Sequence, residues 1–429
     1  MGERLKNQIR EVLPSVLALL RWLVLAGLTG LACGLAGAAF SWCVAKVTAL
    51  RGDFPWLLFF LPAGGLAIVF CYRITGMEND SGTNQIIASV RGGARPPLRL
   101  APLIFLGSVL THLTGGSAGR EGAALQIGGS LAAGIGRLLR VDEKNTNTLI
   151  QSGMAGLFAA LFGTPVAAAV FSLEVVNVGH FRFAALFPCL LSALIAGAVP
   201  QALGLPGEGY LLSGVPEAAV LPLAQTGVLA VSAAVLSILF CLLMHGTGRA
   251  YKRYLPNPYL RILAGAGLVI LLTLLEGSGD YNGAGGQIIE HAVEGRVEVP
   301  WAFALKMLFT ALTLGAGFKG GEIVPTLFIG STFGCAAAPL LGLEPSFGAA
   351  VGMIALFCGV TNCPLASILL SVELFGSGAL PFFALACALA FLLSGRFSLY
   401  SSQKIVYSKL EARLNDQYQT EQEKERLSC

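Results

Sequence analysis

Glu121 is the residue of this chain whose position most clearly suggests chemistry. It stands in G-R-E-G (119–122), a polar break between long apolar runs. A carboxylate inside a membrane is costly and is functional by default. Because protonation removes its charge, such a carboxylate can act as a gate for an anion. The alternative is an ion pair between Glu121 and Arg120 at a helix end.

Two further polar breaks rich in glycine have the same character as G-R-E-G. They are D-S-G-T-N-Q (80–85) and G-G-E-I-V-P (320–325), and each is followed by an apolar run with helical content. The first N–H groups of a helix lack an intrahelical partner and carry partial positive charge, which suits an anion. A single break of this kind is explained equally well by a kink or a tight loop, because glycine is common in membrane helices. Three together favour an anion site built from converging helix ends.

Other residue types point away from metal or enzyme chemistry. The four histidines are far apart in sequence, so we expect no metal centre: His112, His180, His245 and His291. The ten cysteines include no C-x-x-C pair and are interpreted as small hydrophobes. We expect no cofactor and no enzymatic activity, because the scattered histidines offer neither a nucleophile with its base nor a metal set; the alternative of an intramembrane hydrolase would depend on a carboxylate pair of Asp80 and Glu121.

The elements that must position these breaks are membrane helices. Of the 429 residues only 12% are charged and 55% are hydrophobic, and the mean hydropathy is +0.73. Apolar runs recur from about residue 14 to residue 393, so the chain has too little polar surface for a water-soluble body. The net charge of +4 is scattered and no basic stripe occurs, which makes nucleic acid an unexpected partner.

The distribution of basic residues predicts the orientation. The first apolar run, Val16 to Val47, has no small-x-small cleavage site and is interpreted as a retained membrane segment. Arg and Lys gather at both ends of the chain, at Arg4, Lys6, Arg10, Lys404, Lys409, Arg413, Lys424 and Arg426. We expect the protein in the inner or plasma membrane of the cell. By the positive-inside bias, both termini are expected in the cytoplasm. The tail 401–429 is expected to be a short helix or disordered, without a regulatory domain.

The sequence also repeats itself. Residues 154–174 align without a gap on residues 353–373, with identities that include Pro165/Pro364, Ser172/Ser371 and Glu174/Glu373. The glycine-rich breaks align at nearly the same offset. We therefore expect a tandem duplication, and an odd number of crossings in each half would make the repeats inverted. For Glu174 and Glu373, which end equivalent segments, capping or pairing at a helix terminus is the favoured interpretation.

These observations define the predicted organisation. The fold is expected to be an all-α polytopic membrane protein with inverted repeats. Five parts are expected along the chain. They are a cytoplasmic N-terminal segment (1–14), a first membrane repeat (15–205), a connecting region with the start of the second repeat (206–258), a second membrane repeat (259–400) and a short cytoplasmic tail (401–429).

Several stretches resemble the signature sequences of the CLC family of anion channels and anion/proton antiporters. They are GREGAALQIGG (119–129), FGTPVAAAVFSLE (162–174), GGEIVP (320–325) and the late Tyr400, in the family's order. The resemblance implies an inverted repeat of tilted and re-entrant helices and a homodimer with one anion pore in each subunit.

The resemblance also implies roles for individual residues. Glu121 would be the gating glutamate, and Ser81 and Tyr400 would be the central anion ligands. The backbone N–H groups of Ile323 and Val324 would also serve the anion. The glycine and arginine positions of the same breaks complete the expected anion site: Gly82, Gly119 and Arg120.

Departures from the chloride-exchanging pattern leave the ion open. Val175 stands where proton-coupled chloride exchangers carry an internal glutamate, so a conventional proton relay is missing. The T-N pair and the G-G-E-x-x-P form resemble the fluoride-exporting branch, whereas Ser81 keeps the chloride-type ligand. In a fluoride interpretation Asn84, Glu322 and Phe357 would join the site.

We therefore expect transport of a monovalent halide, chloride or fluoride, gated by a protonatable glutamate, in a protein that is either a channel or an exchanger coupled to protons and that lies in the lipid bilayer. The alternative is a proton- or sodium-driven carrier of a small organic anion on the same duplicated helices. Such a carrier needs a wider cavity, whereas the tight glycine-rich breaks favour a small ion.

Overall fold

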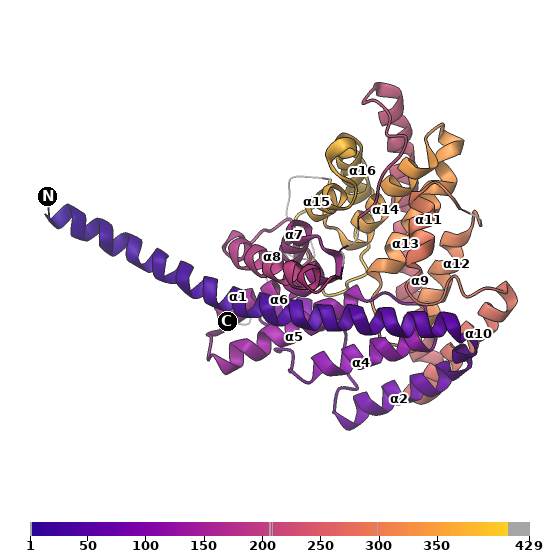
Figure 1. Ribbon diagram of the computed structural model, residues 1–429, viewed down its shortest axis with the longest axis horizontal. Helices are drawn as coiled ribbons and strands as arrows, with labels where there is room; N and C mark the ends of the chain where they lie inside the picture. Colours follow the sequence, from indigo (N-terminus) through magenta and orange to yellow (C-terminus); the bar gives the residue numbers. More distant parts are fainter. Residues whose placement is uncertain (1, 206, 208, 298, 411–429) are drawn as a thin grey trace.

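The protein is almost entirely helical. The computed structural model describes residues 2–205, 207, 209–297 and 299–410, with side chains from residue 13 onward. This part of the chain forms sixteen α-helices, four short 3-10 helices and one two-stranded parallel sheet. Figure 1 shows the helices as one packed body, with the N-terminal end of α1 projecting from it.

The α-helices follow one another in two similar series. The first series is α1 (Gly2–Asp53), α2 (Leu61–Ile74), α3 (Thr83–Val90), α4 (Leu100–Leu113), α5 (Glu121–Leu138), α6 (Glu143–Phe162), α7 (Pro165–Glu174) and α8 (Leu186–Ala202). The second is α9 (Val220–Tyr254), α10 (Pro258–Glu276), α11 (Gly286–Val293), α12 (Ala302–Ala316), α13 (Ile323–Ala337), α14 (Pro345–Thr361), α15 (Pro364–Phe375) and α16 (Leu380–Leu393). The 3-10 helices are η1 (Pro55–Phe60), η2 (Phe183–Ala185), η3 (Ala338–Leu341) and η4 (Ser377–Ala379).

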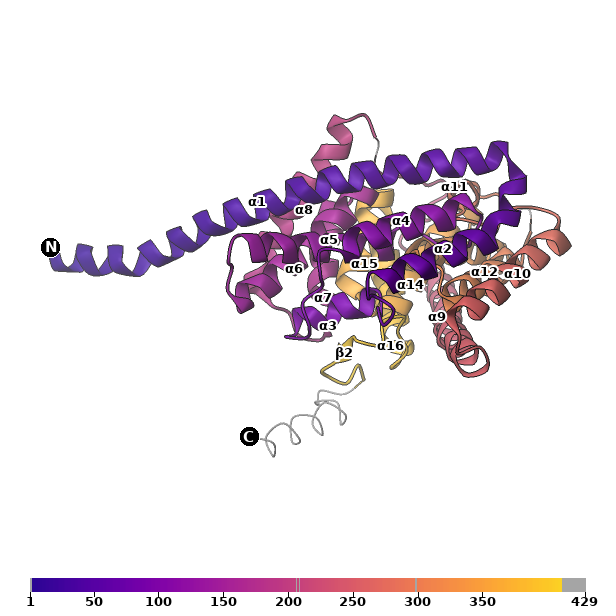
Figure 2. The same ribbon diagram turned by 90° about the horizontal axis from the view of Figure 1, so that it is seen from below.

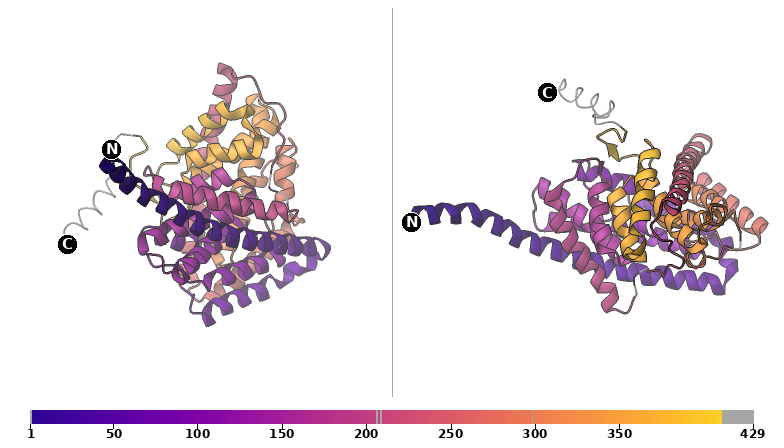
Figure 3. Two further views of the ribbon diagram at one scale, coloured as in Figure 1. Left: turned by 60° about the vertical axis from the view of Figure 1, so that its left-hand side comes forward. Right: turned by 90° about the horizontal axis from the view of Figure 1, so that it is seen from above.

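Corresponding helices have the same place and similar character in the two series. The first helix of each series is its longest, and the third helix has 8 residues. In each series the sixth helix ends at a turn, and the seventh helix then begins with a proline. This is the inverted tandem repeat expected from the sequence, and Figure 3 shows its halves packed side by side. We propose that the second repeat starts at α9, within the predicted connecting region 206–258.

Six of the described helices are long and apolar enough to cross a membrane. Others are too short, since α7 has 10 residues and a helix rises only about 1.5 Å per residue, against roughly 30 Å of hydrocarbon. Broken helices of this kind occur within a membrane only where protein covers their ends. The short helix α7 is accordingly largely buried, as are the longer helices α5, α6, α13 and α14.

Small residues let the helices approach closely. A Cβ atom added to Gly30 of α1 would lie 2.7 Å from the carbonyl oxygen of Ser192 in α8, and one added to Gly34 would lie 2.8 Å from Val199. Small residues at such crossings are typical of membrane helices, where packing rather than water exclusion drives association. The opposite side of α1 carries leucines exposed to the surroundings, including Leu20, Leu28 and Leu35. This side faces lipid.

The first part of the tail folds back onto the first repeat. Strand β1 (Asn177–Val178) pairs in parallel with strand β2 (Lys404–Ile405), on the side of the molecule opposite α1 (Figure 2). The expected helix or disorder is therefore wrong for residues 404–405, because the open backbone that follows α7 offers them a strand partner. Residues 411–429 lie outside the described part of the chain.

Candidate anion site

The breaks of the two repeats meet directly. The N–H of Gly119 donates to the carbonyl oxygen of Gly321, and the N–H of Gly321 donates to that of Gly119, both at 2.7 Å. The two residues form an antiparallel bridge. A Cβ atom on Gly119 would lie 2.8 Å from Glu121 Oε2 and 3.0 Å from Val324 Cβ. Glycine is needed here because the two helix starts approach too closely for any side chain.

Glu121 begins α5 at this bridge and is fully buried. Its Oε2 accepts a hydrogen bond of 2.9 Å from the N–H of Arg120, and its Oε1 lies 3.3 Å from Arg120 Nε. The ion pair considered from the sequence is thus present. The carboxylate sits at the N-terminal end of its own helix, which is a favourable place for negative charge. Glu121 therefore occupies the kind of position that a bound anion would take.

Glu322 brings a second carboxylate to the same place. It precedes α13, and its carbonyl oxygen accepts bonds from Thr326 N at 3.1 Å and Thr326 Oγ1 at 2.8 Å. A Cβ atom on Gly122 would lie 3.0 Å from Glu322 Oε2, so this carboxylate lies against the first turn of α5. The next residues, Ile323 and Val324, are buried. Their N–H groups belong to the first turn of α13 and have no intrahelical partner.

Tyr400 is the third side chain near the two carboxylates. Its side chain is buried, and its hydroxyl has no hydrogen-bond partner within the described residues. The Glu322 carboxylate lies beside this hydroxyl without full hydrogen-bond geometry, and Glu121 is close enough to interact with it electrostatically. Its backbone is held by a bond of 3.1 Å from Tyr400 N to Ser398 Oγ. A buried hydroxyl without a partner is an available donor for an anion.

The third break approaches from α3. Asp80 Oδ1 accepts a bond of 3.0 Å from Gly82 N, and Gly82 has a φ of +64°, which favours glycine. Asp80 Oδ2 also lies 3.1 Å from Lys319 Nζ, in an ion pair that joins the first repeat to the second. Ser81, expected to be a central ligand, is exposed. Asn84 Oδ1 accepts a bond of 2.9 Å from Ser402 N and so connects α3 to the tail.

Two side chains that the sequence analysis did not select reach the break at Glu121. Thr83 Oγ1 donates to the carbonyl oxygen of Gly122 at 3.3 Å, and Gln126 Nε2 donates to the same oxygen at 3.1 Å. Gln126 is buried, and its Oε1 has no partner among the residues described. A polar residue in the second turn of an otherwise apolar helix was the available signal for Gln126. Thr83 was signalled by the T-N pair.

Phe357 packs against another aromatic ring. It is buried in α14, and the centroid of its ring is 5.8 Å from that of Phe171 in α7. The Phe171 ring in turn lies 5.2 Å from Phe158 in α6. Its surroundings are the aromatic packing of these three helices, and its role toward an ion stays a prediction.

The prediction of helix capping for Glu174 and Glu373 is confirmed. Glu174 accepts bonds from the N–H groups of Leu365 and Ala366, at 3.2 and 2.9 Å. Glu373 does the same for α7, with Val166 and Ala167 as donors at 3.0 and 2.8 Å. Each carboxylate therefore caps the helix that corresponds to its own in the other repeat.

The chain is similar in sequence to known chloride and fluoride channels and transporters. The sequence model of the family described as voltage gated chloride channel matches residues 63–395. The chain is 36% identical over 420 residues to a chloride/fluoride channel protein of Pseudomonas syringae pv. tomato, covering 95% of this chain and 92% of the relative. It is 27% identical over 407 residues to an H(+)/Cl(−) exchange transporter of Vibrio campbellii, covering 82% and 81% of the two chains.

Solved structures are similar over most of the chain. A CLC-type fluoride/proton antiporter superposes with a TM-score of 0.87 and 35% identity, covering 90% of this chain and 98% of the other. A slow cyanobacterial Cl−/H+ antiporter, at 22% identity, gives a TM-score of 0.75 and covers 87% and 94%.

Proposed function

This chain belongs to the voltage gated chloride channel (CLC) family, and we propose on that premise that it carries a monovalent halide across the cell membrane, with fluoride as the ion. The relatives are named as channels and transporters, which supports transport rather than catalysis. The relative and the solved structure whose names include fluoride share more identity with this chain than the chloride exchangers compared above. The G-G-E-I-V-P break also supports fluoride, since it brings a carboxylate to the site.

The observation that carries this proposal is the convergence of Glu121, Glu322 and Tyr400 where α5 and α13 begin. An anion entering here is stabilised by the helix ends and by the Tyr400 hydroxyl. The Glu121 carboxylate competes with the anion for the same position. Protonation removes its charge, and the anion can then replace it. Glu121 is accordingly the gate, and proton uptake is coupled to the movement of the ion.

We assign the remaining ligands by their place at the breaks. The backbone at Gly82, Gly119, Ile323 and Val324 and the side chain of Arg120 line the path. Asn84, Glu322 and Phe357 belong to the fluoride form of the site. Ser81 is exposed just before α3. We therefore assign it a contact with the ion only as the ion enters the path from the surface.

The protein is oriented with both termini in the cytoplasm of a cell whose inner or plasma membrane holds it. It acts as a homodimer in which each subunit has its own pore. The basic residues at both ends support this orientation, and the exposed apolar faces of the long helices support the surrounding bilayer.

The test is ion efflux from liposomes that contain the purified protein, recorded with fluoride- and chloride-selective electrodes while external pH is monitored. Preferred fluoride efflux with proton movement is the expected result. Chloride efflux without proton movement would contradict both the ion and the coupling. Absence of flux for either ion would instead favour the carrier of a small organic anion.

A further inference from the structure

A second group of cations lies outside the site described above. Lys306 of α12 is fully buried. Its Nζ donates to the carbonyl oxygens of Tyr281 and Gly283, at 3.1 and 2.7 Å, and lies 5.0 Å from the ring centroid of Phe328. These bonds account for two of its three ammonium protons.

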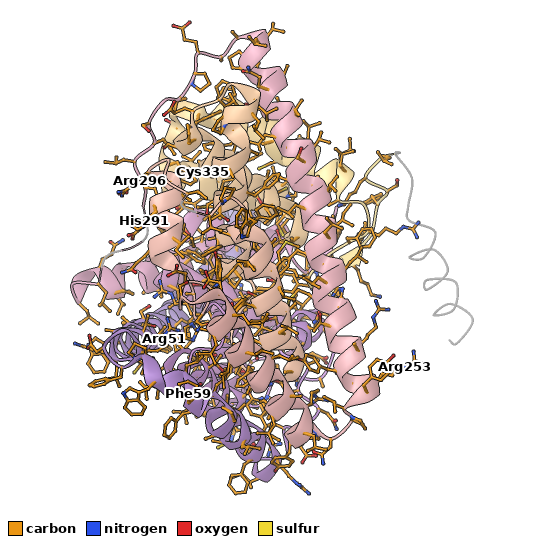
Figure 4. All side chains as sticks on the ribbon, turned by 90° about the vertical axis from the view of Figure 1, so that its right-hand side faces the viewer. Arg51, Phe59, Arg253, His291, Arg296 and Cys335 are labelled. Carbon is orange, nitrogen blue, oxygen red and sulfur yellow. The ribbon has the colours of Figure 1, made fainter. Side chains whose placement is uncertain are left out.

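Arg51 reaches the same loop from the end of α1. Its Nη1 lies 3.5 Å from the carbonyl oxygen of His112. A Cβ atom on Gly283 would lie only 2.7 Å from this nitrogen, so the guanidinium packs against Gly283. Arg51 and Lys306 therefore both contact Gly283, Lys306 at the carbonyl oxygen and Arg51 on the Cα side. Figure 4 shows Arg51 on the side of the molecule away from Arg253.

The imidazole of His112 is the third member of the group. It is fully buried, and its Nδ1 lies 2.8 Å from the carbonyl oxygen of Ser108, which assigns the proton to Nδ1. Its Nε2 has no partner within the described part of the chain. The imidazole lies within electrostatic range of Arg51, Lys306 and Arg120. A ligand with negative charge would favour a proton on Nε2 and give that atom a partner.

Hydroxyl groups connect this cluster to the gate. Thr310 follows Lys306 by about one turn of α12, and its Oγ1 lies 3.1 Å from Ser117 Oγ. Ser117 N donates to Thr313 Oγ1 at 3.1 Å. Ser117 precedes Glu121 by four residues. The Ser117–Thr310 contact therefore lies one helical turn from Lys306 on α12 and four residues before Glu121 in the chain.

The cluster has no resident negative charge. Among the described residues, no ion pair joins a carboxylate to Arg51, His112 or Lys306. Arg51 and Lys306 repel one another. Asp53, two residues after Arg51, is exposed, and the carboxylates just before the loop at Tyr281, Glu276 and Asp280, interact with Tyr281. Buried like charges without a counter-charge are unfavourable, and a small anion would relieve the repulsion.

We propose that Arg51, His112 and Lys306 form a second anion-binding site, which holds a small inorganic anion on the outer approach to Glu121. This inference rests on the proposed function and orientation, because the cytoplasmic N-terminus places the Arg51 end of α1 outside. The anion passes from this site along Ser117 and Thr310 to the position at which Glu121 competes with it. The ligand class is a monovalent halide, bound mainly by charge.

The first test measures fluoride flux in liposomes as a function of fluoride concentration. In Lys306→Met and Arg51→Met the half-saturating concentration should rise about tenfold, since one nearby charge is lost. Lys306→Arg, which retains the charge, should stay close to the wild type. Arg253→Met is the matched control, because it removes an exposed arginine on the opposite side. An unchanged half-saturating concentration in Lys306→Met and Arg51→Met would overturn the site while leaving halide transport intact.

The second test does not depend on transport or on a variant that folds. Crystals of the full wild-type chain are soaked in bromide, and anomalous scattering locates the halide. A bromide peak next to Lys306 Nζ and Arg51 is expected. Its absence there, with bromide present at the Glu121 break, would overturn the second site alone. Wild-type liposomes without halide flux would overturn the proposed function, and the bromide map would then decide the site independently.

Discussion

Glu174 and Glu373 cap each other's helices. The Glu174 carboxylate accepts hydrogen bonds at the N-terminus of α15, the helix that contains Glu373. The Glu373 carboxylate accepts hydrogen bonds at the N-terminus of α7, the helix that ends in Glu174. The two bonds of each carboxylate go to successive N–H groups. This reciprocal arrangement follows from the inverted symmetry of the repeats and joins them at a point far from any covalent connection.

Removing one of these caps should destabilise the protein. Glu373→Gln or Glu174→Gln loses the charge that two N–H groups bind, and a cap of this kind contributes about 1–2 kcal/mol. Thermal unfolding in detergent measures the change. Glu344→Gln is the matched control, because Glu344 is the N-cap residue of α14 and makes no side-chain cap bond. Equal losses in all three variants would contradict the capping role.

The pH dependence of transport should depend on Glu121. Glu121→Gln cannot be protonated or deprotonated near neutral pH, so flux in this variant should no longer change with pH. The measurement is halide efflux from liposomes across a pH series. Glu143→Gln, at the exposed first position of α6, should keep the wild-type pH profile. Flux that still varies with pH in Glu121→Gln would count heavily against its role as gate.

The close approach of the two breaks should not tolerate a methyl group. Gly119→Ala places a Cβ atom 2.9 Å from Pro325 Cδ as well as against Glu121, and overpacking of this kind costs about 1–3 kcal/mol. We expect a lower unfolding temperature and a loss of most of the halide flux. Gly246→Ala is the control, since open space surrounds Gly246 in α9. Wild-type flux and stability in Gly119→Ala would show that the bridge is not needed.

The hydroxyl of Tyr400 should matter for binding more than for stability. It has no hydrogen-bond partner within the structure described, so Tyr400→Phe leaves no buried polar group unsatisfied. Loss of one hydrogen bond to the ion should raise the half-saturating halide concentration several-fold. The unfolding temperature should change little. Tyr407→Phe, at a position that is 47% exposed, serves as control. A large loss of stability without a binding change would assign Tyr400 a structural role.

Asp142 gives a pH-dependent contribution to stability outside the membrane. Hydrogen bonds from the backbone and side chain of Asn145 hold the pKa of Asp142 below its usual range. Its capping contribution to α6 is therefore complete above the pKa of an unfolded aspartate, about 4, and is lost as pH falls through the lower folded value.

Asp142→Ala should lower the free energy of unfolding by about 1 kcal/mol near neutral pH. The difference from the wild type should shrink in strong acid, and unfolding in detergent at a series of pH values measures it. Asp53→Ala, at the exposed end of α1, should show no such trend. A difference that stays constant down to the lowest pH would contradict the assignment.

The sequence by itself determined the class of protein and the duplication, and it singled out Glu121 as the predicted gate. Scarcity of charge predicts membrane helices because an unpaired polar surface cannot lie in lipid. The offset between the repeats can be read directly by comparing the sequence with itself. The position of Glu121 at a glycine-rich break can also be read directly from the sequence. Capping by Glu174 and Glu373 was predictable because both end equivalent helices. Each of these features depends on local sequence or its repetition.

The tertiary structure alone decided which groups meet. Gly119 faces Gly321, and Asp80 pairs with Lys319, across separations of more than 200 residues. No periodic pattern encodes such contacts, because they depend on how the two repeats cross. Ser81 turned out exposed while Thr83, two residues later, reaches Gly122, since a helix start turns neighbouring side chains in different directions. Long-range packing, not local preference, therefore selects the side chains that meet where α5 and α13 begin.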